Sequence, residues 1–180
     1  MALDGQGHYK EAIDAYFSAL RVLETQHDTP FVANTLLNIS AVFQEQKNSD
    51  KGIEFALKAL HLYEVTGDKQ GMARSLINVG NCYNNKKDYR TAQVHLERAE
   101  ALALEYRDPH DLVLIHGTMI SVLLNQGRHH EALPYFDREL ELLTRFDAKA
   151  ELGELLLGKA QTLNTLKRYL QALPDGQAAL

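Results

Sequence analysis

The sequence predicts an all-α solenoid in which antiparallel helix pairs of similar length repeat along the chain. The first observation is spacing: small residues recur at whole multiples of 40 positions, at Ala12, Gly52, Ala92, Ala132 and Ala172. The second is periodicity, because apolar residues recur every three or four positions, as over residues 50–63, and strand-like alternation is absent. The third is composition, since 4 Pro and 11 Gly in 180 residues leave few helix breakers.

The predicted elements follow in chain order. A helix over residues 8–27 comes first, followed by the pairs 29–46 with 50–65, 69–86 with 89–106, and 109–126 with 129–146. A helix over 149–167 and a short one from about residue 169 complete the chain. Because the loops between these long helices are short, consecutive helices are expected to lie antiparallel.

Two sets of periodic breaks justify these boundaries. Asp28, Asp68 and Asp108 are 40 residues apart, and each precedes a new apolar-periodic segment. An Asp at such a point can cap a helix by accepting a backbone N–H, and Pro30 and Pro109 suit a first helical turn. The second set consists of turns in the same register: Gly7-His8, Lys47 to Asp50, Lys87-Asp88, Gly127-Arg128 and Lys167-Arg168.

This register predicts a single array over residues 1–180. It consists of a half repeat (1–28), three repeats (29–68, 69–108 and 109–148) and a truncated repeat (149–180). The missing half units predict a fragment of a larger protein. An apolar helix face needs a neighbour, so pairing of two copies through exposed terminal helices is the alternative expectation.

The repeated positions resemble the tetratricopeptide repeat family. The best copy of its pattern is Leu76, Val79, Gly80, Tyr83, Tyr89, Ala92, Leu96 and Ala99, and weaker copies recur in register along essentially the whole chain. The resemblance implies a right-handed superhelix with a concave groove lined by the first helix of each repeat. The period of 40 is similar to the long-repeat branch found in bacterial signalling proteins and in polarity scaffolds. It implies protein or peptide binding, not catalysis.

Groove positions carried over from the resemblance include five candidate peptide-binding residues: Asn34, Asn38, Arg74, Asn78 and Asn81. Asn38 and Asn78 lie one repeat apart, and an amide can donate to and accept from the backbone of an extended peptide. Arg74 adds a charged fork for a carboxylate or phosphate. The alternative is that these polar residues are simply a solvated face.

Two departures from the family pattern suggest an ion pair. Glu139 stands where a small residue is usual, and Lys159 stands where an apolar one is usual. Their opposite charges on adjacent helices predict a contact across the last repeat junction. The alternative is that both side chains point to solvent.

Other functions find little support in the sequence. No catalytic motif, cofactor loop or metal-ligand spacing is present, and the adjacent His129 and His130 point in different directions on a helix. The formal charge is −5 with no basic stripe, which argues against nucleic acid as a partner. No apolar run approaches the roughly 20 residues that span a bilayer. The single Cys82 and the absence of a signal-peptide core predict a reducing, cytoplasmic location.

The sequence thus predicts a non-catalytic module that binds a protein or peptide segment in a concave groove. The alternative is a regulatory or dimerisation input region of a multidomain signalling protein.

Overall fold

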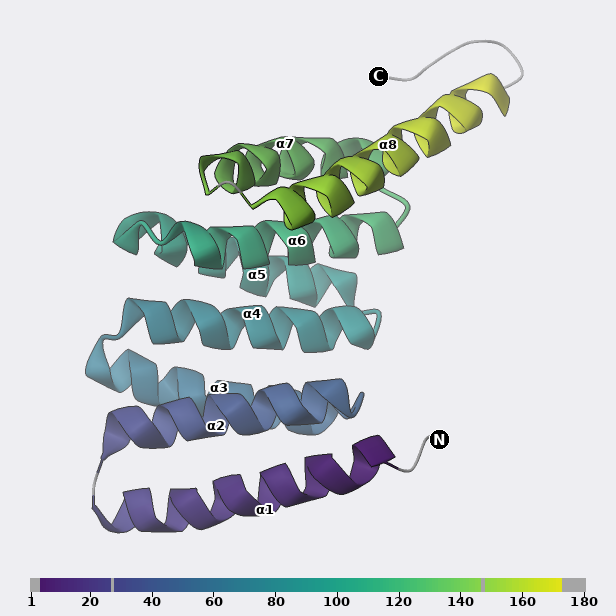
Figure 1. The fold of residues 1–180 in the computed structure, drawn as a ribbon. Helices are drawn as coiled ribbons and strands as arrows, with labels where there is room; N and C mark the ends of the chain where they lie inside the picture. Colours follow the sequence, from purple (N-terminus) through teal and green to yellow (C-terminus); the bar gives the residue numbers. More distant parts are fainter. Residues whose placement is uncertain (1–3, 27, 147, 173–180) are drawn as a thin grey trace. The chain divides into compact units, whose positions relative to one another are not determined.

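A computed structural model describes residues 4–26, 28–146 and 148–172, which form eight α-helices and no strand (Figure 1). The all-α prediction is confirmed. The helices are α1 (Asp4–Thr25), α2 (Thr29–Glu45), α3 (Ser49–Thr66), α4 (Lys69–Asn85), α5 (Tyr89–Tyr106), α6 (Pro109–Asn125), α7 (His129–Arg145) and α8 (Lys149–Ala172). The chain divides into two compact units, residues 1–111 and 112–180, and the division falls within α6.

The predicted caps and turns set the helix boundaries. Asp68 accepts a hydrogen bond from the backbone N–H of Gly71 at 3.0 Å, and Asp28 caps α2 in the same way. In the second set of turns, Lys47, Lys87 and Gly127 recur every 40 residues with left-handed φ angles of 58°, 62° and 74°. These local signals explain why helices begin at a fixed interval.

The predicted turn at Lys167-Arg168 is wrong, because α8 continues without a break from Lys149 to Ala172. The physical reason lies in the turn chemistry. The equivalent turns contain either an Asn or Asp that caps the next helix, as Asn48 and Asp88 do, or a left-handed glycine, Gly127. Residues 167–168 supply neither, and both are good helix formers. Ala172, the last small residue of the 40-residue series, has its side chain outside the described part of the structure.

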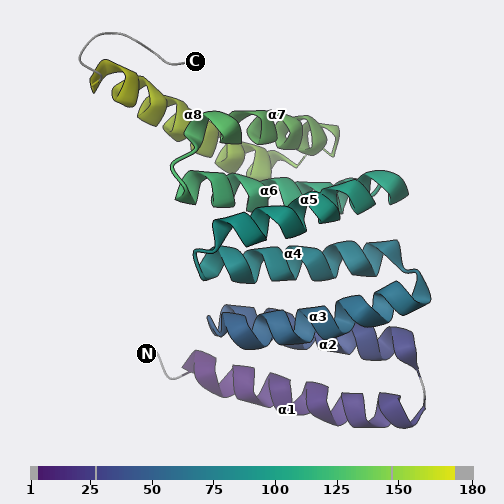
Figure 2. The same cartoon turned by 180° about the vertical axis from the view of Figure 1, so that it is seen from behind.

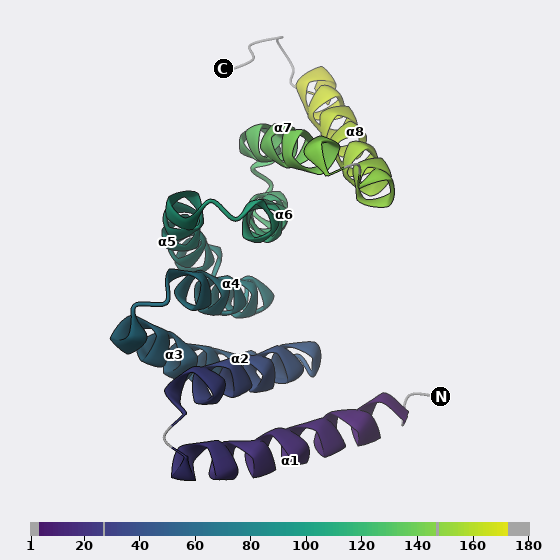
Figure 3. The same ribbon diagram turned by 60° about the vertical axis from the view of Figure 1, so that its left-hand side comes forward.

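Helices of the first unit are stacked in chain order, each packed against the next. They form two layers: α2 and α4 face the viewer in Figure 1, whereas α3 and α5 face the viewer in the reverse view of Figure 2. Figure 3 shows the same succession obliquely. Because α2 and α4 also contact each other directly, equivalent positions of these first helices share one face.

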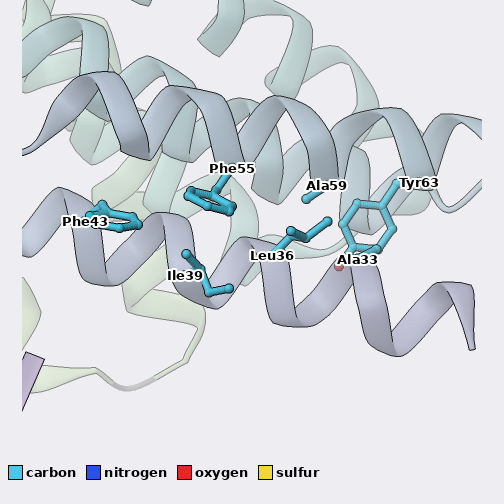
Figure 4. Packing of buried hydrophobic residues seen from close by; sticks show 7 residues of the cluster. All are labelled: Ala33, Leu36, Ile39, Phe43, Phe55, Ala59 and Tyr63. Atoms are coloured by element: carbon cyan, nitrogen blue, oxygen red, sulfur yellow. The ribbon is translucent and has the colours of Figure 1, made fainter. Parts of the chain in front are cut away.

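A cluster of apolar side chains joins α2 to α3 (Figure 4). The Phe43 and Phe55 rings stack with centroids 5.5 Å apart, and Phe17 of α1 meets Phe55 edge-on at 5.7 Å. Ala33 and Ala59 are fully buried between these larger groups, so the two helices approach closely. The small-residue spacing has the same cause, since Ala92 and Ala132 are also fully buried.

Gly52 shows why one position in this series has no side chain. A Cβ atom built there would lie 2.6 Å from the Cys82 sulfur of α4, well inside van der Waals contact. Cys82 is itself fully buried, so it has little room to move. In addition, the Ser40 hydroxyl donates a 2.8 Å hydrogen bond to the carbonyl oxygen of Gly52, which ties α2 to α3 at this point.

Candidate protein-binding face

The five predicted site residues all come from α2 and α4 of the first unit. Asn34 and Asn38 are exposed on α2, Arg74 is exposed on α4, and Asn78 and Asn81 of α4 are half-buried. Asn34 and Arg74 hold equivalent positions in consecutive repeats, as do Asn38 and Asn78. The contact between α2 and α4 therefore places the five residues on one face of this layer.

A polar cleft opens between the C-terminal ends of α2 and α4. Its volume is about 630 Å³, and its walls include three asparagines of α4: Asn78, Asn81 and Asn85. Gln44 and Glu45 of α2 face them, and Ala41, Lys47 and Ser49 complete the lining. The structure thus brings Asn78 and Asn81 together in one cleft, whereas Asn34, Asn38 and Arg74 lie outside its lining.

Asn34 has a role within its own repeat. Its side-chain oxygen accepts a 2.7 Å hydrogen bond from the hydroxyl of Tyr63, a buried residue of α3. Burial, assisted by the negative charge of Asp68, raises the pKa of the Tyr63 hydroxyl, so this group remains a donor at neutral pH. The bond satisfies a buried polar group, and it therefore links Asn34 to the stability of the fold.

Arg74 is held in place by a carboxylate that the sequence reasoning missed. Its Nε donates to both oxygens of Asp111, at 3.1 and 3.2 Å, and the Tyr106 hydroxyl donates to the same carboxylate at 2.8 Å. Asp111 is only 1% exposed, while the Arg74 side chain is 49% exposed. Burial and the bond to Asp111 raise the pKa of Tyr106. Asp111 therefore fixes the orientation of the guanidinium group on a side chain that remains half exposed, and Tyr106 holds the same carboxylate.

Polar pairs of this kind recur at a sequence separation slightly shorter than the 40-residue repeat. The Arg74–Asp111 pair spans 37 residues, and four other polar pairs in the first unit span 34 to 38. They are Lys69–Glu105, Gln70–Asp108, Lys86–Asp50 and Arg98–Glu64. A search for complementary side chains slightly less than one repeat apart would have identified them.

In the second unit, the predicted ion pair between Glu139 and Lys159 is wrong. Lys159 pairs with Asp137, an exposed residue two positions before Glu139 in α7. Glu139 is buried, at 8% exposure, and it forms no ion pair in the described part of the chain. The expectation that both side chains point to solvent also fails for Glu139. The flexible lysine reaches the carboxylate that stays in water, because pairing there avoids desolvation.

Within the described ranges, no group of three or more His, Cys, Asp or Glu side chains is arranged to hold a metal ion. In the same ranges, no helix combines the length and the apolar character that crossing a membrane would require.

The paired helices, the small-residue contacts and the face formed by α2 and α4 together define a helical repeat. Residues 31–105 match the tetratricopeptide repeat family. Tetratricopeptide repeats generally mediate protein–protein interaction. The match covers the part of the chain with the clearest small-residue pattern, including both helices that line the polar cleft.

Two known proteins resemble the chain over longer stretches. The photosystem I assembly protein Ycf3 of Cyanophora paradoxa is 28% identical over 102 residues, which are 57% of this chain and 54% of that protein. The crystal structure of BtubC (BKLC) from P. vanneervenii superimposes with a TM-score of 0.69 at 22% identity, over 78% of this chain and 59% of that one. The second likeness supports the solenoid fold. This chain spans little more than half the length of either protein.

Proposed function

We propose that this chain is a non-catalytic repeat module that binds a protein segment along the α2–α4 face. The observation that carries the proposal is the cleft of about 630 Å³ with Asn78, Asn81 and Asn85 in its wall. These amides are spaced along one side of α4, and each offers both a donor and an acceptor. The relative from Cyanophora paradoxa is named an assembly protein, and a role in assembly is consistent with the proposal.

The chemistry of the cleft favours backbone recognition of an extended segment. Amide groups can pair with peptide N–H and C=O groups whatever the side chains of the ligand, as in other modes that read the main chain. Glu45 and Lys47 at the cleft add charges of both signs, so no strong charge preference is expected there. Arg74, which Asp111 orients, supplies a separate position for a carboxylate of the ligand.

The test is affinity capture with quantitative mass spectrometry, followed by titration of the captured segment as a synthetic peptide. Two double variants are compared with the wild type: Asn78→Ala with Asn81→Ala, and Asn38→Ala with Asn78→Ala. Asn164→Ala, an exposed position on α8, is the matched control. We expect both double variants to lose the ligand while their unfolding temperatures stay close to that of the wild type. Equal peptide affinity in all four proteins would contradict the proposal.

A second candidate function has its own observation. Leu156 and Leu157 of α8 are 54% and 61% exposed, so two adjacent leucines present apolar surface on this helix. We propose as the alternative that the chain is a regulatory input region that dimerises through α8, in the signalling context implied by the long repeat. Light scattering over a range of concentrations tests it. A dimer that Leu157→Glu dissociates supports this alternative, and a wild-type monomer at all concentrations excludes it.

A further inference from the structure

The second unit contains a separate cavity of about 520 Å³. Three helices form its walls. The lining residues include Val113, Gly117 and Ile120 from α6; Phe136, Glu139 and Leu143 from α7; and Glu151, Glu154 and Gly158 from α8. Apolar groups form most of the lining, and the polar groups are largely carboxylates. Such a combination of apolar walls with a few polar groups is typical of a pocket that orients a specific ligand.

Glu139 is the unusual group in this cavity. It is 8% exposed, and its Oε2 atom is buried without a hydrogen-bond partner in the described structure. A buried, unpartnered carboxylate is costly, so proteins seldom keep one without a reason. Burial raises its pKa to about 7, against the opposing influence of the nearby His116. The group is therefore poised to ionise when a positive charge reaches it.

Glycines of α6 and α8 keep the space around this carboxylate open. A Cβ atom at Gly117 would lie 3.5 Å from Oε1 of Glu139, so any side chain longer than alanine there would extend into the space beside the carboxylate. At Gly158, a Cβ atom would lie 3.3 Å from the Phe136 ring, on the other side of the cavity. Larger side chains at these two positions would occupy the volume that remains available to a ligand.

Charge indicates what kind of ligand fits. Three carboxylates, Glu139, Glu151 and Glu154, line the cavity, and none of its described lining residues is basic. Lys159 of α8, which was expected to pair with Glu139, forms its ion pair with Asp137. A ligand with a positive end and an aliphatic stem would satisfy Glu139 and cover the apolar walls at the same time.

We infer that this cavity binds a lysine or arginine side chain of a protein partner. The inference rests on the proposed protein-binding function for the source of the ligand, but it uses none of the residues of the α2–α4 face. The aliphatic stem would lie against Ile120 and Leu143, and the cationic head would reach the Glu139 carboxylate, with Glu151 and Glu154 at the entrance supplying long-range attraction.

The test uses simple probes on the whole chain labelled with ¹⁵N. n-Pentylammonium is titrated and compared with n-pentanol, its neutral isostere, and with a short acetylated peptide that carries one lysine between glycines. We expect both cations to shift the amide signals of Gly117 and Gly158, while Gly71 and Gly80 of the first unit do not respond. Equal shifts from n-pentanol would overturn the inference, because they would indicate an apolar cavity without charge selection.

Variants assign the effect to the carboxylate. Glu139→Gln should weaken n-pentylammonium binding by about tenfold or more, the usual effect of losing a charge-assisted hydrogen bond. Glu141→Gln, an exposed α7 position that pairs with Arg145, is the matched control and should bind like the wild type. Should Glu139→Gln fail to fold, the exposed Glu154→Gln still tests the charge of the cavity. Undiminished affinity in the folded variants would contradict the inference.

Two further measurements complete the test. Wild-type affinity should rise from pH 6 to pH 8, because Glu139 ionises in this range, facing His116 of α6 and near Glu151 and Glu154 of α8. The increase should be smaller in Glu139→Gln. Putrescine serves as a small-molecule amine, and binding much tighter than that of the lysine peptide would reject a protein side chain as the ligand. The same titrations on the Asn78/Asn81 double variant should be unchanged, so this inference and the proposed function can fail separately.

Discussion

Gly52 occupies a position at which neighbouring repeats have alanine, and its surroundings predict the result of restoring a methyl group. Gly52→Ala would place Cβ 2.6 Å from the Cys82 sulfur, so we expect a loss of about 1–3 kcal/mol in unfolding free energy from overpacking. Urea denaturation measures the loss. The double variant with Cys82→Ala should be less unstable than the sum of the single variants, because the clash is removed.

Gly153 is the matched control for this substitution. It lies inside α8, and no atom surrounds the position that its Cβ would take. Gly153→Ala should therefore stabilise the chain by roughly 0.5–1 kcal/mol through helix propensity alone. A Gly52→Ala variant that gains stability like Gly153→Ala would show that the α2–α3–α4 junction is not tightly packed.

The raised pKa of Glu139 predicts that the free energy of unfolding depends on pH. Its pKa is about 7 in the folded chain against an ordinary value of 4.5, so the folded state binds the extra proton between these limits. Its contribution to stability is thus complete below about pH 4.5 and is lost as the pH rises through 7. Between pH 5 and pH 8, the wild type should lose about 1–3 kcal/mol more than Glu139→Gln. Parallel pH profiles of the two proteins would contradict this.

At the scale of single elements, the N-cap of α5 provides a clean test of why helices begin where they do. Asp88 accepts from the Thr91 backbone N–H at 3.2 Å and from the Thr91 hydroxyl at 2.8 Å. Asp88→Ala should cost about 1 kcal/mol in unfolding free energy. Asp88→Asn keeps an acceptor oxygen and should cost less. Equal effects of the two substitutions would assign the loss to charge and not to capping.

The helices could be predicted from the sequence because their limits depend on local chemistry. Caps such as Asp28 and Asp68, and left-handed turn residues such as Lys47 and Gly127, act on neighbouring backbone groups, so their spacing reveals the repeat. The prediction of a turn at residues 167–168 was wrong for the same reason. The repeat register alone cannot end a helix when no capping residue or left-handed residue is present.

The repeat register does not determine which partner each charged side chain of the candidate sites contacts. The repeat pattern indicated Glu139 as the partner of Lys159, whereas the structure pairs Lys159 with Asp137, a carboxylate that stays in water. Similarly, Arg74 was predicted from its face, but its orientation depends on Asp111, 37 residues away on the next first helix. Such contacts follow from the packing of helices and from rotamers, and a one-dimensional pattern determines neither.

For the molecule as a whole, burial differs widely between helices. α4 contributes eight buried residues, including Leu76, Val79 and Cys82, and it packs against both α3 and α5. In α8, by contrast, the only buried side chain among residues 149–168 is Thr162. In a repeat protein each helix is stabilised mainly by its neighbours, so these differences should appear as differences in local opening free energy.

Native-state hydrogen exchange followed by NMR tests this directly. After correction for intrinsic rates, amides in the middle of α4 should exchange at least about 100-fold more slowly than those in the middle of α8, a difference of roughly 3 kcal/mol in opening free energy. Gly52→Ala should reduce the protection of α3 and α4, whose junction it disturbs, and leave the fast exchange of α8 unchanged. If all helices instead exchanged through one opening of equal free energy, the array would unfold as a single cooperative block, and nearest-neighbour packing would not describe its stability.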